Sequence, residues 1–182
     1  DRAIDCAKLA GFSNIVVTTD HLGVAYMEYG LFRPAPLHTD TCSMVDVGLD
    51  VLTRVPGPDD QQVLLLQPTQ PLRQPKHLNV ALSALHDYES VVSLVSVESV
   101  DKLYAEGLVA SIEQRQKARP TYTCDGTVYG FRRAFFMKHQ QFVMGGSYRL
   151  LIPKTETCSL DDMEDWAIAE KRVPAYQPNS VV

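Results

Sequence analysis

The sequence lacks several motifs that identify common enzyme classes. Its four cysteines (Cys6, Cys42, Cys124 and Cys158) include no C-x-x-C pair, so they indicate no zinc site and no disulfide framework. The five histidines show no metal-ligand spacing. There is also no serine nucleophile elbow and no G-x-x-x-x-G-K-[ST] phosphate loop. Kinase and hydrolase activities are therefore disfavoured.

The chain also has little basic charge and no long apolar run. Its net charge of −5 argues against nucleic acid as a partner, because such a partner requires clustered lysine and arginine. Two short basic clusters, residues 115–119 and Arg132 with Arg133, suit a small anionic ligand or a solvated face. No apolar run approaches 20 residues and no signal peptide is present, so we expect no membrane partner. With reduced thiols as the default, we expect a cytoplasmic protein.

A length of 182 residues suits one domain with a sizeable core. Apolar and β-branched runs predict strands at 14–19, 63–66, 90–97 and 148–152. Helical periodicity predicts helices at 3–10, from 44, at 76–85, at 135–141 and from 161. This alternation predicts an α/β fold with a mainly parallel sheet flanked by helices. Residues 121–131 look extended and broken at Asp125-Gly126, which favours a hairpin turn, and residues 98–120 form a polar excursion.

Gln67 follows a buried strand directly and stands in a loop stiffened by Pro68 and Pro71. In open α/β sheets, ligands bind beyond the carboxyl ends of the strands. Gln67 is therefore a candidate to bind a substrate through its amide. An ordinary polar loop is the alternative.

Two further segments lie at expected helix starts. The loop 33–43 leads into a helix that Ser43 and Asp46 should cap, and a helix N-terminus favours an anion. A simple capped helix explains it equally well. Residues 159–165 are rich in aspartate, which complements a helix dipole but can also bind Mg²⁺ together with substrate phosphates.

Taken together, five blocks resemble the acylneuraminate cytidylyltransferases, the CMP-sialic acid synthetases. They occur in the family's order and span nearly the whole chain. The blocks are IVVTTD (15–20), RPAPLHTDTCS (33–43), LLLQPTQPLR (64–73), DGTVYGFRRAFF (125–136) and LDDMEDWAIAE (160–170). The resemblance implies one Rossmann-like nucleotidyltransferase domain over 1–182, with residues 98–120 as a protruding dimerisation segment.

The resemblance also implies a reaction. CMP passes from CTP to the anomeric hydroxyl of a nine-carbon 2-keto-3-deoxy sugar acid, pyrophosphate is released, and Mg²⁺ is required. The acid could be sialic, legionaminic or pseudaminic acid, and the enzyme a homodimer.

Site residues follow from the matching blocks. The resemblance implies nucleotide contacts by Arg33, Asp40, Thr41, Cys42 and Ser43. It implies sugar-acid contacts by Gln67, Thr69, Arg73, Arg115, Asp125 and Tyr129. Asp161 would bind Mg²⁺.

The chain departs from the family pattern at several points. Ser159 stands where the family has the first aspartate of its acidic motif, Asp125 where many members have asparagine, and Met44 where a small polar residue is usual. The glycine-containing first motif, which holds the triphosphate, would precede Asp1, so we expect the chain as given to be inactive without it. A degenerate sugar-nucleotide-binding protein and a cytidylyltransferase for the eight-carbon acid Kdo remain alternatives.

Overall fold

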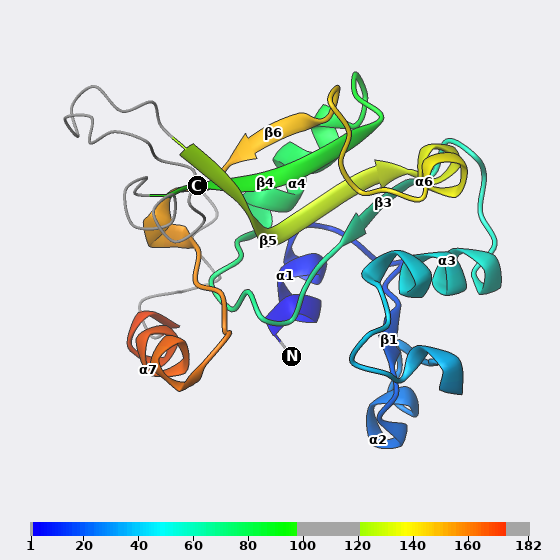
Figure 1. Ribbon diagram of the computed structural model, residues 1–182, viewed down its shortest axis with the longest axis horizontal. Coiled ribbons are helices and arrows are strands. Elements are labelled where there is room, and N and C mark those ends of the chain that lie inside the picture. The colour runs from blue at the N-terminus through cyan, green and yellow to red at the C-terminus, as the bar shows by residue number, and fades with distance from the viewer. Residues whose placement is uncertain (1, 98–120, 174–182) are drawn as a thin grey trace, which may run out of the picture.

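A four-stranded mixed sheet forms the centre of the computed structural model, which describes residues 2–97 and 121–173 (Figure 1). Its strands lie in the order β3 (Gln62–Leu65), β5 (Thr121–Arg132), β4 (Ser90–Val97) and β6 (Tyr148–Leu151). Strand β5 runs antiparallel to β3 and β4, whereas β4 and β6 are parallel. Three strands therefore share one direction, and the expected α/β fold is confirmed. The proposed dimerisation segment 98–120 lies outside the described residues.

Helices cover both faces of this sheet, because alternate strand residues point to opposite sides. On one face, α4 (Pro75–Ala84) packs Ala81 against Val91 and Val128. On the other, α3 (Met44–Arg54) and α6 (Arg133–His139) pack around the buried Phe131. Helix α1 (Arg2–Leu9) lies against α4, and α7 (Met163–Arg172) follows the last strand. None of the helices within the described ranges has the length and apolarity needed to cross a bilayer.

Two short strands stand apart from the central sheet. Strand β1 (Val17–Thr19) pairs in parallel with β2 (Gly30–Phe32), and the short helix α2 (Leu22–Ala25) connects them. The prediction of a buried strand at 14–19 is wrong in extent and burial. Only its last three residues pair, and all three are partly exposed, because β2 is their only hydrogen-bonded neighbour in the described sheets.

The predicted hairpin turn at Asp125-Gly126 is also wrong, because β5 continues through it for 12 residues. Val92 pairs with Tyr129 and Leu94 with Cys124, so residues 125–128 bulge opposite a single residue of β4. That residue, Ser93, accepts a hydrogen bond from the Val128 amide at 2.9 Å. Gly126 has a φ of +75°, a conformation that glycine adopts at little cost, and this allows the bulge.

Candidate active site

The buried side chain of Arg73 holds the loop after β3 in place. Arg73 is 3% exposed, and its Nε donates to the carbonyl of Thr127 in β5 at 2.6 Å. Its Nη2 donates to the carbonyl of Gln67. Hydrogen bonds from a charged donor are roughly twice as strong as neutral ones. Arg73 was predicted to contact the sugar acid, and the structure shows it joining the loop to β5.

A cavity of about 390 Å³ lies beside Gln67. Its walls come from the end of β3, the bulged part of β5, the first turn of α3 and the turn after α6. The lining residues are Met44, Val45, Leu65, Gln67, Cys124, Tyr129, Gln140, Gln141, Phe142 and Val143. The cavity therefore places Gln67 and Tyr129, two predicted sugar-acid residues, beside the helix that follows the predicted nucleotide loop.

Tyr129 and Cys124 are neutral groups in this cavity. Burial raises the pKa of the Tyr129 phenol, and the neighbouring Cys124 and Asp125 raise it further. Burial likewise raises the pKa of the Cys124 thiol, with Asp125 adding to the effect. Near neutral pH the phenol therefore keeps its proton and can donate it in a hydrogen bond.

Asp125 is already hydrogen-bonded within β5. Its carboxylate accepts from the Thr127 hydroxyl at 2.6 Å and from the Thr127 amide at 3.1 Å. Next to it, the Oε1 atom of Gln67 lies 2.0 Å from the position that a Cβ on Gly126 would occupy. The bulge thus leaves room for the Gln67 amide only because residue 126 has no side chain.

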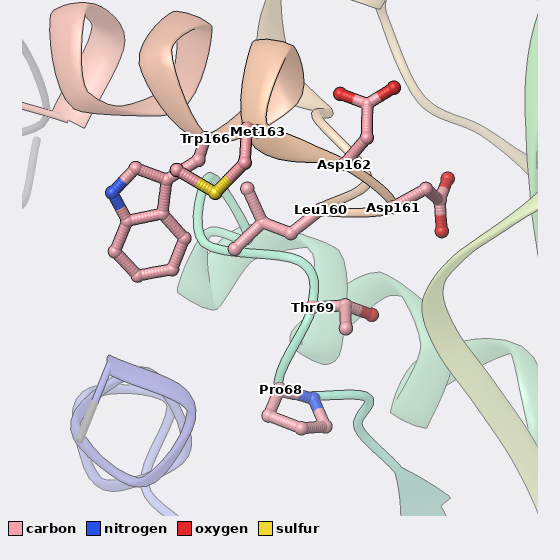
Figure 2. Close-up of a pocket in the computed structure, with 7 residues that line it drawn as sticks. All are labelled: Pro68, Thr69, Leu160, Asp161, Asp162, Met163 and Trp166. Atoms are coloured by element: carbon pink, nitrogen blue, oxygen red, sulfur yellow. The ribbon is translucent and has the colours of Figure 1, made fainter.

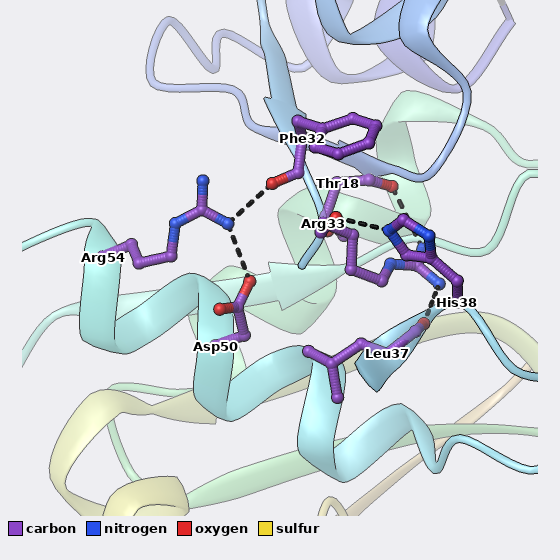
Figure 3. Close-up of polar contacts among 7 residues, drawn as sticks. All are labelled: Thr18, Phe32, Arg33, Leu37, His38, Asp50 and Arg54. Carbon is purple, nitrogen blue, oxygen red and sulfur yellow. Dashed lines mark hydrogen bonds and ion pairs between the residues drawn. The ribbon is translucent and has the colours of Figure 1, made fainter. Parts of the chain in front are cut away.

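The loop between β2 and α3 is held less firmly (Figure 3). The guanidinium of Arg33 donates to the carbonyls of Leu37 and Thr18 at 3.4 and 3.3 Å, and its buried Nε has no partner. His38 donates from Nε2 to the Arg33 carbonyl at 2.5 Å. From α3, Arg54 donates to the Phe32 carbonyl at 2.8 Å. The long bonds and the unpaired donor show that the fold does not satisfy Arg33 fully.

The rest of this loop leads into α3. Asp40 and Thr41 are exposed and Cys42 is half-buried. Ser43 is the N-cap of α3: its hydroxyl accepts from the Asp46 amide at 3.1 Å and donates to the Asp46 carboxylate at 2.7 Å. The predicted cap is confirmed, and it occupies the Ser43 side chain.

The acidic segment lies at the start of α7, across an open groove of about 580 Å³ from the proline-rich loop (Figure 2). Asp162 is the N-cap, and its carboxylate accepts from the amides of Glu164 and Asp165. Asp161 is exposed, and its carboxylate has no partner among the described residues. In Figure 2 the carboxylates of Asp161 and Asp162 point away from the indole of Trp166.

These residues fit part of a magnesium site. Mg²⁺ takes one or two protein carboxylates and completes its shell with water and substrate phosphates, and Asp161 can supply one such ligand. Within residues 2–97 and 121–173, no group of three or more His, Cys, Asp or Glu side chains could hold a metal ion. Any Mg²⁺ held here would therefore depend on phosphate oxygens of the nucleotide.

Comparisons with known proteins point to one family. The chain is 29% identical over 184 residues to CMP-N,N'-diacetyllegionaminic acid synthase of Legionella pneumophila, which covers 90% of this chain and 79% of that protein. It is 27% identical over 148 residues to N-acylneuraminate cytidylyltransferase of Streptococcus agalactiae, covering 75% of this chain and 35% of the relative. No family model matches the chain. These similarities support the acylneuraminate cytidylyltransferase family for this chain. The relatives are named as cytidylyltransferases, which are nucleotidyltransferases.

The structure brings some of the predicted site residues together and separates others. Gln67 and Tyr129 share the cavity, whereas Thr69 and Asp161 share the open groove. Arg33 lines neither space. Arg115 lies outside the described residues.

Sequence reasoning missed the wall formed by residues 140–143. Helix α6 was expected to continue to Gln141, but it ends at His139, and Gln140 adopts a left-handed conformation with φ of 51°. This turn brings Phe142 into stacked contact with Phe136, at a ring-centroid distance of 4.9 Å. An aromatic residue directly after the expected helix, Phe142, was the sequence signal for this wall, although the sequence did not indicate that it packs against Phe136.

Proposed function

We propose that the protein transfers CMP from CTP to the anomeric hydroxyl of a nonulosonic acid. The observation that carries this proposal is the cavity in which Gln67 and Tyr129 face the first turn of α3. An acceptor bound there would lie next to the loop that the resemblance assigns to the nucleotide. The relatives' names support the same chemistry, since they include a diacetyllegionaminic acid synthase and an N-acylneuraminate cytidylyltransferase.

The residues suggest how the reactants are aligned. The Gln67 amide can donate and accept hydrogen bonds to the sugar acid, and the neutral Tyr129 phenol can donate another. The anomeric oxygen then attacks the α-phosphorus, the bond from that phosphorus to the bridging oxygen breaks, and pyrophosphate leaves with the bonding electrons. The proton of the anomeric hydroxyl passes to solvent. Alignment of the attacking oxygen is the main contribution of the pocket.

Charge on the phosphates must be neutralised during this transfer. We propose that Arg33 contacts the nucleotide, since its guanidinium has unused donors. We also propose that Asp161 holds Mg²⁺, which supplies Lewis-acid stabilisation of the phosphate oxygens when bound. A cytoplasmic homodimer is the assembly that the family resemblance supports.

Pyrophosphate release tests the proposal. The full-length protein is incubated with CTP, Mg²⁺ and a panel of sialic, legionaminic, pseudaminic and Kdo acids. We expect release with at least one nine-carbon acid. We further expect Gln67→Leu to raise the KM for that acid about tenfold or more, since a hydrogen-bonding site that loses its polar group rejects the substrate. Asn79→Ala, which removes an exposed amide from α4, is the matched control. Lack of release with every acid would show the assignment to be wrong.

A second candidate is a nucleotide-binding protein without turnover. Ser159 in place of the first acidic residue, with no three-ligand metal group among the described residues, supports it. Calorimetry that shows CTP binding by full-length protein, with no product from any acid, would favour this function over the first.

A further inference from the structure

The segment before α7 is attached to the loop after β3 and to the start of α4. Glu156, in the 3₁₀ helix η2 (Lys154–Glu156), accepts from Lys76 Nζ at 2.7 Å and contacts His77 Nε2 at 2.8 Å. Further along, the Leu160 amide donates to the Thr69 carbonyl at 3.0 Å. These contacts hold the segment up to the residue just before the candidate magnesium ligand.

The charges at Glu156 keep this attachment in place at neutral pH. Burial lowers the pKa of His77, so its ring is neutral, although the Glu156 carboxylate opposes the shift. Its Nδ1 accepts from the Gln74 amide at 3.3 Å, so Nε2 carries the proton and donates to Glu156. Burial would raise the pKa of Glu156, but the hydrogen bonds from Lys76 and His77 outweigh it and hold that pKa below its usual value.

Gln70 connects this segment to the bulge in β5. Its side chain is 3% exposed, and both ends of the amide are used. The Oε1 atom accepts from the Thr157 hydroxyl at 3.1 Å, and Nε2 donates to the Asp125 carbonyl. Because a backbone carbonyl only accepts, the amide has to present its nitrogen to Asp125 and its oxygen to Thr157. One buried side chain therefore joins three segments that are distant in the sequence.

We propose that Gln70 is a positioning residue, which fixes the separation between the Gln67 amide and the Asp161 carboxylate. The proposal rests on the proposed function, in which these two groups serve the acceptor and the nucleotide phosphates. The hydrogen bond between Gln70 and Thr157 joins the two segments close to both groups. Gln70 is three residues after Gln67, and Thr157 is four residues before Asp161. Transfer requires the attacking oxygen and the phosphate to be aligned, and a displacement of about 1 Å can reduce the rate about a hundredfold.

The two bonds of Gln70 can be broken separately. Thr157→Val removes the hydroxyl from a half-buried residue, keeps its shape, and leaves the bond from Gln70 to Asp125 intact. We expect kcat to fall about tenfold or more, while the KM for the sugar acid stays within about twofold, because the Gln67 side of the bridge is unchanged. Thr157→Ser keeps the hydroxyl and should restore kcat.

A second measurement does not depend on turnover. Amide hydrogen exchange at Leu160 reports whether the segment still rests on the loop, and exchange at Val91, a fully buried residue of β4, reports global stability. We expect Thr157→Val to accelerate exchange at Leu160 about tenfold without changing exchange at Val91, and Thr157→Ser to match the wild type.

The outcomes separate the two proposals. A wild-type protein that releases no pyrophosphate with any acid disproves the proposed function, and the exchange at Leu160 then decides whether Gln70 holds the segment. An active wild type with unchanged kcat in Thr157→Val overturns the positioning role. The same conclusion follows if Thr157→Ser is as impaired as Thr157→Val, or if the variant loses folded protein while its kinetic constants stay the same.

Discussion

The loop after β3 lines the cavity through Gln67, and the loop between β2 and α3 leads into the helix that forms another wall, yet the two loops are held very differently. In the first, the buried Arg73 donates to two backbone carbonyls, at 2.6 Å for Thr127. In the second, Arg33 makes two bonds of 3.3 and 3.4 Å, and its Nε is unpaired. We infer that Arg73 mainly stabilises the fold, whereas Arg33 contributes little to it.

The largest expected effect is at Arg73. Arg73→Met leaves the carbonyls of Thr127 and Gln67 without their donor in a buried position, and we expect a loss of about 3 kcal/mol in the free energy of unfolding. Urea unfolding followed by fluorescence measures it. Arg73→Lys keeps the charge but not the fork of donors, so its loss should be smaller. If Arg73→Met lowers the free energy of unfolding by less than about 1 kcal/mol, then Arg73 does not hold its loop more firmly than Arg33 holds the other.

Arg33 should show the opposite behaviour. Arg33→Met removes only long hydrogen bonds, so we expect a change in unfolding free energy of less than about 1 kcal/mol, but a reduction in CTP affinity of about tenfold or more. Calorimetry with CTP on the full-length protein provides the measurement. Arg54→Met, which also loses a bond to a backbone carbonyl, that of Phe32 at the end of β2, is the control and should bind CTP normally. If Arg33→Met destabilises the fold as much as Arg73→Met, then Arg33 is structural.

Gly126 tests how the first loop places Gln67. Gly126→Ala puts an alanine at a φ of +75° and sets its Cβ against Gln67 Oε1, so we expect a loss of about 1 kcal/mol in stability. The flexible amide can move away, so the larger consequence should be a higher KM for the sugar acid. Gly146→Ala, whose added Cβ meets no atom within 4 Å, is the control. Equal KM values in the two variants would mean that Gln67 does not touch the acceptor.

The smallest expected effect concerns pH. Burial lowers the folded-state pKa of His77 below its ordinary value of 6.5, so the unfolded chain takes up a proton there more readily than the folded protein. Stability should therefore fall as the pH drops below about 6.5. Acid-side unfolding curves of wild type and His77→Gln would show it, the variant being flatter between about pH 6.5 and 5. Glu156, whose folded-state pKa lies below its ordinary value of 4.5, adds a further loss at lower pH.

Local patterns in the sequence predicted local features well. Ser43 caps α3 as expected, and the strand 90–97 has the predicted bounds. The cap depends on residues only three positions apart, and the strand has an unambiguous apolar pattern. The candidate family was also identifiable, because five blocks occur in order along the chain.

Contacts between distant segments were not predictable. Asp125-Gly126 is typical of a hairpin turn, and only the pairing with β4, about 30 residues away, makes it part of a continuous strand. The arginine of the QPTQPLR block was predicted to contact the sugar acid, and nothing in the sequence indicated its hydrogen bond to Thr127, 54 residues further on. His77 and Glu156, separated by 79 residues, gave no sign of pairing. Polar residues that stabilise the fold and those that bind ligand look alike until their partners are known.

The bulge in β5 has a consequence for which side chains can share the cavity. In a regular strand, side chains alternate, so Cys124 and Tyr129, five positions apart, would face opposite sides of the sheet. Both line the cavity, because the residues between them are paired against a single residue of β4 and the alternation is reset. The bulge thus places two side chains that are an odd number of positions apart on the same side of the sheet. A strand that kept its length but lost the bulge would turn one of the two side chains away from the cavity.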